Sequence, residues 1–138
     1  MMLKDIHILP IIIAALSAFL VGGLWYSPLL FGKVWQLAEG LSDAQCQKGH
    51  KPLVYTAAFL LSILSATVLS YILGAKPSLS YAVAISFLIG LGFITTSLGV
   101  NYLFAQRDVK LFLIDSGYHI VQFITYGIIF GVWHKFLC

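Results

Sequence analysis

Asp115, His119 and Gln122 lie in a stretch of sequence that is otherwise apolar. With Tyr126 they follow one another at intervals of four, three and four residues. At about 100° per residue, the four side chains project within roughly 60° of one another on one helix face. An aspartate and a histidine one turn apart can carry a proton, gate a cation or hold helices together by hydrogen bonds. Because an ionisable group at membrane depth costs at least a few kcal/mol, we expect this stripe to face protein or a solvated cavity.

Two more polar residues are expected at the same depth on the preceding helix. If the chain turns about Asp108, Asn101 lies level with Asp115, because each is the same distance from the turn. By the same count, Ser97 lies level with His119. The predicted intramembrane polar site is therefore Asp115, His119, Gln122, Asn101 and Ser97.

The motif around Pro28 is predicted to flank this site. Proline has no N–H, so Pro28 frees the carbonyl of Leu24, four residues earlier. The motif comprises Trp25, Tyr26, Ser27 and Pro28. Its aromatic residues have an alternative interpretation, since tryptophan and tyrosine are common anchors at the membrane interface.

The composition requires membrane helices to position these groups. The chain is 60% hydrophobic and 9% charged, whereas soluble domains are about a quarter charged. A bilayer core of about 30 Å needs about 20 apolar residues in a helix. Runs of this length occupy residues 8–30, 53–73, 81–104 and 111–133. The sequence therefore predicts an all-α membrane protein, a single integral membrane domain over residues 1–138 with four antiparallel transmembrane helices in an up-down bundle.

The long loop after the first run has its own helix signal. Ser42 is followed three residues later by Gln45, which fits a capping box. The sequence predicts a short cytoplasmic helix over residues 43–48 that ends at Gly49.

Small residues recur every fourth position along the second run, and Gly127 and Gly131 form a GxxxG pair in the fourth. In lipid, helices associate through close packing of such residues. We therefore predict a helix contact, within the bundle or between protomers of a homo-oligomer, at Ala58, Ser62, Ala66, Ser70, Gly74, Gly127 and Gly131.

The distribution of basic residues predicts an orientation. Four spans place both termini on one side, with three basic residues there and five opposite. The positive-inside rule then places both termini outside the cytoplasm. The first set is Lys4, Lys76 and Lys135, and the second is Lys33, Lys48, Lys51, Arg107 and Lys110. Cys46 and Cys138 consequently face opposite sides of the membrane.

Metal and covalent chemistry lack a recognisable motif. Asp115 and His119 are two candidate ligands, whereas a catalytic zinc site usually has three from the protein. The sequence contains no serine elbow, H-E-x-x-H or C-x-x-C motif. We predict no catalytic residue, no metal, no cofactor and no nucleic-acid partner, and keep a membrane enzyme as a third alternative.

Two stretches, "LWYSPLLFGKVW" and "NYLFAQRDVKLFLIDSGYHIVQF", together resemble one bacterial family over essentially the whole chain. It is the family of small four-helix membrane proteins called domain of unknown function 1761. The resemblance implies multi-pass helices in the bacterial inner membrane, without an agreed activity. The residues that carry it are Trp25, Tyr26, Ser27, Pro28, Phe31, Gly32, Lys33, Trp35, Asn101, Phe104, Arg107, Tyr118 and His119.

Besides the membrane enzyme, two functions remain open from these residues. In the first, the chain is an oligomeric transporter or channel-like protein for a proton, ion or small solute, and Asp115 and His119 form its polar intramembrane site. In the second, it is a structural or accessory membrane protein whose polar stripe only locks helix packing. The lipid bilayer is a partner in both.

Overall fold

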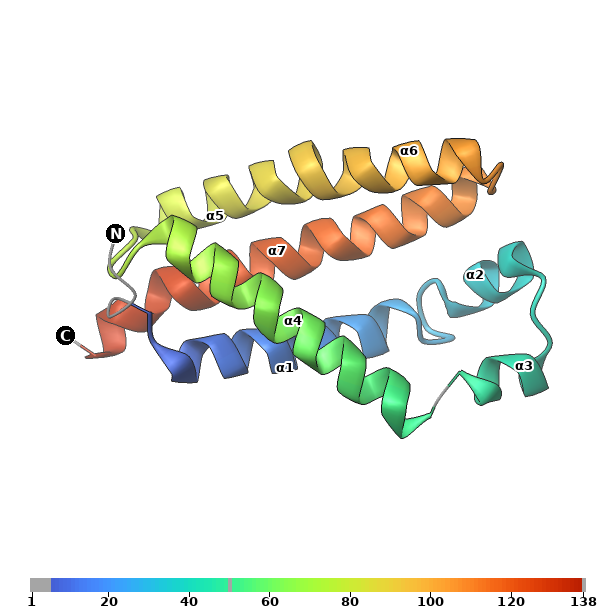
Figure 1. Cartoon of the computed structure of the whole chain (residues 1–138), viewed down its shortest axis with the longest axis horizontal. Helices are drawn as coiled ribbons and strands as arrows, with labels where there is room; N and C mark the ends of the chain where they lie inside the picture. Colours follow the sequence, from blue (N-terminus) through green and yellow to red (C-terminus); the bar gives the residue numbers. More distant parts are fainter. Residues whose placement is uncertain (1–5, 50, 138) are drawn as a thin grey trace.

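The computed structural model describes residues 6–49 and 51–137, and all its regular elements there are helices. The predicted all-α class is confirmed. Figure 1 shows the long helices side by side, with the short α2 and α3 at one end. In chain order the elements are α1 (Ile8–Trp25), α2 (Gly32–Glu39), α3 (Asp43–Lys48), α4 (Pro52–Leu73), α5 (Leu79–Ile89), the π-helix η2 (Gly90–Thr95), α6 (Thr96–Phe104) and α7 (Val109–Leu137).

Three helical stretches among the described residues are long and apolar enough to cross a membrane: Ile8–Trp25, Pro52–Leu73 and Leu79–Phe104. Large apolar side chains on these stretches are uncovered, and Leu20 and Phe104 are 77% and 87% exposed. Such surfaces are unfavourable in water and suit the hydrocarbon core of a bilayer. The structure is therefore compatible with a membrane protein.

The first helix is shorter than the predicted run over residues 8–30. α1 ends at Trp25, because Pro28 cannot continue the helical hydrogen bonds. The chain then turns tightly, and a Cβ on Gly32 would lie 2.3 Å from the carbonyl oxygen of Tyr26. Only glycine fits this close approach. The turn leads directly into α2, which the hydropathy pattern did not predict.

The capping box in the loop forms as the sequence predicts. Ser42 Oγ accepts a hydrogen bond from the backbone N–H of Gln45 at 3.2 Å, and the Gln45 side chain accepts one from the Ser42 N–H at 2.8 Å. These bonds satisfy two of the free donors at the start of α3, which covers the predicted residues.

α7 is the central helix, with α1 against one part of its surface and α5 and η2 against another. α4 packs chiefly on α1. The core joins aliphatic residues of α1, α4 and α5 to aromatic residues of α7. Its members are Ile11, Ala14, Ala18, Ala66, Leu69, Leu73, Ala82, Phe123, Tyr126 and Phe130.

The Gly127 and Gly131 pair lies in the contact between α7 and α5. A Cβ on Gly127 would lie 2.6 Å from Ser86 Oγ and 2.7 Å from the carbonyl oxygen of Ala82. A Cβ on Gly131 would lie 2.8 Å from the Cα of Leu79. The backbones approach so closely that neither position has room for a side chain.

The row of small residues on α4 is buried most deeply at its centre. Ala66 is fully buried and Ser70 is buried, while Ala58, Ser62 and Gly74 are partly buried. Ala66 also belongs to the same core cluster as residues of α1. The structure thus places the middle of this row inside the chain's own core.

Substituting Ala66 by leucine is expected to destabilise the fold by about 1–3 kcal/mol, because extra methylenes would overfill a packed contact. Thermal melting in detergent measures this loss. Ala57→Leu is the control, because Ala57 is exposed on the same helix. If both variants melt like the wild type, the row is not a tight contact.

Candidate functional site

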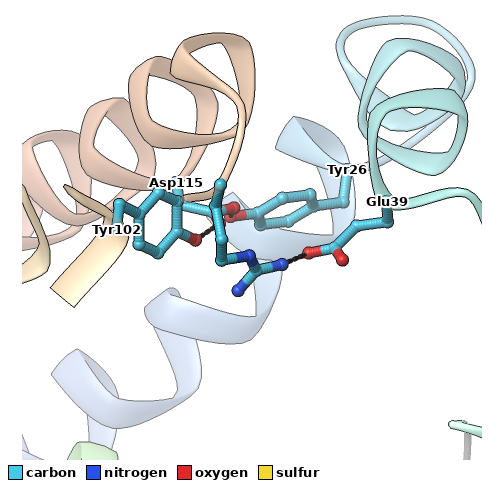
Figure 2. A network of polar contacts seen from close by, with 5 residues as sticks. Tyr26, Glu39, Tyr102 and Asp115 are labelled. Atoms are coloured by element: carbon cyan, nitrogen blue, oxygen red, sulfur yellow. Dashed lines mark hydrogen bonds and ion pairs between the residues drawn. The ribbon is translucent and has the colours of Figure 1, made fainter. Parts of the chain in front are cut away.

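The carboxylate of Asp115 accepts hydrogen bonds from two tyrosines on other segments. Tyr26 Oη donates to Oδ1 at 2.6 Å, and Tyr102 Oη donates to Oδ2. Figure 2 shows the carboxylate between the two phenol rings. Because Tyr26 follows α1 and Tyr102 belongs to α6, this one side chain connects three parts of the chain.

The end of α1 is held on α7 by further side-chain to backbone bonds. Trp25 Nε1 donates to the carbonyl of Ile114 at 2.9 Å, and Tyr118 Oη donates to the carbonyl of Ala18 at 3.0 Å. Gly117 leaves room for the indole, since a Cβ there would lie 2.9 Å from Trp25 Cζ2. These contacts fix the position from which Tyr26 reaches Asp115.

Ser27 and Pro28 have separate roles in the same motif. Ser27 donates to the carbonyl of Leu24 through its N–H at 3.2 Å and its Oγ at 2.7 Å. The carbonyl that Pro28 leaves free is therefore satisfied locally. Pro28 itself lines the cavity beside Asp115.

The predicted polar stripe divides into two groups along α7. His119 Nδ1 lies 2.8 Å from Gln122 Oε1, and Gln122 Nε2 donates to Tyr126 Oη at 2.8 Å. Gln122 and Tyr126 are buried, while His119 is partly buried. Asp115 makes its hydrogen bonds to the two tyrosines instead. The stripe faces the protein, but its aspartate and histidine belong to different networks.

Ser97 and Asn101 are exposed, and the structure does not bring them to the α7 stripe. The residue of α6 that meets Asp115 is Tyr102, which sequence counting missed. Gln106 has a left-handed backbone, with φ of 55°, in the turn before α7. One residue along a helix is a rotation of about 100°, so Asn101 and its neighbour Tyr102 project from different faces of α6.

A second contact ties α2 to the hairpin between α6 and α7. Arg107 forms an ion pair with Glu39, and its guanidinium lies 4.8 Å from the ring centre of Tyr102. Figure 2 shows Glu39 close to Tyr26, Tyr102 and Asp115. Exposed ion pairs contribute about 0–1 kcal/mol, so this one orients α2 more than it stabilises the fold.

A cavity of about 650 Å³ adjoins Asp115. This volume falls in the usual range for small-molecule sites, about 300–1,000 Å³. The lining combines charged, amide and aromatic side chains from the turn after α1, from α2 and α3, and from α7. The lining residues are Tyr26, Pro28, Gly32, Lys33, Trp35, Gln36, Leu41, Asp43, Gln45, Cys46, Gly49 and Asp115.

Metal binding has no support from the geometry of the described ranges. Within residues 6–49 and 51–137, no three histidine, cysteine, aspartate or glutamate side chains cluster as a metal site would require. The described side chains near Asp115 instead offer hydrogen-bond donors, carboxylates and aromatic faces.

The helices and the cavity together define a helical, membrane-compatible protein with a polar site at one end. Residues 9–131 match the family described as Protein of unknown function (DUF1761), and the chain belongs to this family. The resemblance carried by the two sequence motifs is thereby confirmed. No curated protein and no solved structure matches the chain.

Proposed function

We propose that this protein binds a small solute or cation in the cavity beside Asp115 and, as a homo-oligomer, moves the solute or a proton across the bacterial inner membrane. One observation carries the proposal. Asp115, an ionisable residue of a long helix, lines a cavity of about 650 Å³ instead of being sealed in the core. Ionisable groups in membrane helices that face a cavity commonly mark ion or substrate pathways.

The proposed membrane fold has four antiparallel spans, with α7 as the fourth. α7 contains 29 residues, more than the about 20 needed to cross a bilayer. Its polar residues make it less apolar than a typical span. Because α1 and α5 pack against it, these groups gain protein partners in place of lipid.

A homo-oligomer is proposed because the site lies at one end of the chain's helices. The cavity is lined from the turn after α1, the short helices and Asp115, and the core beyond it is packed with residues such as Phe123 and Tyr126. A continuous pathway would therefore need surfaces from neighbouring copies.

The proposed orientation places both termini outside the cytoplasm and Cys46 inside. In a Cys138→Ser variant, a membrane-impermeant maleimide is expected to leave Cys46 unlabelled in intact cells and to label it after permeabilisation. Labelling of Cys46 in intact cells would reverse the orientation.

Proton flux into liposomes containing the purified protein tests the transport function. An imposed gradient is expected to produce flux above that of empty liposomes, and Asp115→Asn is expected to remove most of it. Asp108→Asn is the matched control, because Asp108 is exposed in the turn before α7 and does not line the cavity. If proton flux into liposomes with the wild-type protein is no greater than into empty liposomes, the result contradicts the proposal.

His119→Gln tests whether the second polar group of α7 takes part. The substitution keeps hydrogen-bonding capacity and replaces the imidazole by an amide, which does not carry a proton. A proton-carrying role predicts unchanged melting with reduced flux. Unchanged melting with unchanged flux would restrict the site to Asp115.

A structural or accessory role is the second candidate, and a specific observation favours it. Both carboxylate oxygens of Asp115 accept tyrosine hydroxyls from other segments, as expected of a packing lock. Under this alternative, Asp115→Asn changes melting and leaves the permeability of liposomes unaffected.

A further inference from the structure

The cavity beside Asp115 carries fixed charges of both signs. Asp115 and Asp43 contribute carboxylates, and Lys33 contributes an ammonium group. Asp43 Oδ1 accepts a hydrogen bond from Gln36 Nε2 at 2.8 Å, which holds that carboxylate in place. Lys33 is exposed and forms no ion pair with any residue in the described part of the chain. A cation is thus available in the lining, together with two oriented carboxylates.

Two aromatic rings form another part of the lining. Tyr26 and Trp35 meet edge to face, with ring centres 5.8 Å apart. Aromatic faces attract ammonium groups through the ring quadrupole, and tryptophan does so most strongly. Because the hydroxyl of Tyr26 is bonded to Asp115, the aromatic surface and the carboxylate are adjacent.

We propose that this cavity binds a zwitterion in which an ammonium group lies a few bonds from an anionic group. The ammonium group contacts the carboxylate of Asp115 and the Tyr26–Trp35 pair, and the anionic group contacts Lys33. A simple cation would leave Lys33 as a repulsive neighbour, and a simple anion would face two carboxylates. This inference rests on the proposed function in taking the Asp115 cavity as the binding site, and it does not require transport.

Two sources can supply this chemistry. A volume of about 650 Å³ admits a free aminoalkyl phosphate or the headgroup of a zwitterionic phospholipid. Both present an ammonium group and a phosphate separated by two carbons, so they share the recognition by Asp115 and Lys33. A headgroup carries acyl chains that must remain in the bilayer. The two sources can therefore be distinguished by comparing a free probe with a lipid bilayer.

Cys46 provides the reporter, because its partly buried thiol lines the same cavity. In a Cys138→Ser background purified in detergent, the rate of maleimide labelling at Cys46 measures occupancy. At a ligand concentration about tenfold above Kd, labelling is expected to slow by about tenfold. The free probe is O-phosphoethanolamine, with ethanolamine and inorganic phosphate as its separate halves. The lipid probe is a nanodisc of phosphatidylethanolamine, compared with one of phosphatidylglycerol.

Slower labelling with O-phosphoethanolamine, and little change with either half, supports the proposal with a free ligand. Slower labelling only in phosphatidylethanolamine nanodiscs supports it with a lipid headgroup. Lys33→Gln should abolish the protection, while Lys48→Gln, an exposed lysine of α3 that does not line the cavity, should retain it. Labelling that no probe slows, or protection that survives Lys33→Gln, overturns the proposal. If proton flux into liposomes persists after either of these results, the proposed function still holds. Failure of the zwitterion proposal is therefore distinguishable from failure of the proposed function.

Discussion

Replacing Gly127 by alanine is expected to lower the free energy of unfolding by about 2 kcal/mol, within the usual range for overpacking. The added Cβ would lie 2.6 Å from Ser86 Oγ and 2.7 Å from the carbonyl oxygen of Ala82. The carbonyl of Ala82 belongs to the backbone of α5 and cannot shift alone without a large energetic cost, so α5 must separate from α7. Chemical denaturation in mixed micelles measures the loss.

Gly23→Ala is the matched control for this prediction. Gly23 lies in α1, and a Cβ there meets nothing within 4 Å. Alanine is better than glycine inside a helix by about 0.5–1 kcal/mol, so this variant should be as stable as the wild type or more so. Equal stability of Gly127→Ala and the wild type would mean that α5 and α7 are further apart than in this structure.

Asp115→Ala is expected to lower the free energy of unfolding by about 2 kcal/mol. Hydrogen bonds to charged groups each contribute about 1.5–3 kcal/mol, and hydrogen bonds to solvent in the cavity replace part of the two that are lost. The variant leaves the hydroxyls of Tyr26 and Tyr102 without their acceptor. The contacts between α7, α6 and the turn after α1 should loosen together. Denaturation in mixed micelles and protease sensitivity of the α2–α3 segment measure the change.

Removing the two hydroxyls as well is the decisive comparison. Replacing both partners of a hydrogen bond by apolar groups is often nearly neutral, so adding Tyr26→Phe and Tyr102→Phe to Asp115→Ala should restore about half of the lost stability or more. A single Asp115→Ala variant that is more stable than the wild type would contradict the packing lock. That result would favour a carboxylate kept for binding at a cost in stability.

The helices follow from local features of the sequence. Long apolar runs form helices in a bilayer, because every backbone group must then be paired within its own segment. The α3 cap likewise depends on Ser42 and Gln45, which are three residues apart. The end of α1 was harder to predict from the sequence. Pro28 marked a break, but the position of Trp25 as the last helical residue depends on the turn that follows.

The candidate site was predicted only in part. Asp115 and the Trp25–Pro28 motif were recognised, since a charge in an apolar run and a proline in a helix are visible without a structure. Tyr102 was missed in favour of Asn101, because counting residues from the turn fixes the level of a side chain along the helix and not the face from which it projects. The cavity could not be foreseen, since its lining comes from segments that are distant in the sequence.

The sequence by itself determined the helical class, the apolar segments, the family and the presence of a charged residue that needs partners. These are properties of composition and of neighbours within one or two turns. Only the tertiary structure decided that Asp115 pairs with Tyr26 and Tyr102, while His119 pairs with Gln122. The physical reason is that a hydrogen bond between helices requires both side chains to point at each other within about 3 Å. That direction changes by about 100° with every residue, so it depends on how the helices are rotated against one another in the folded chain.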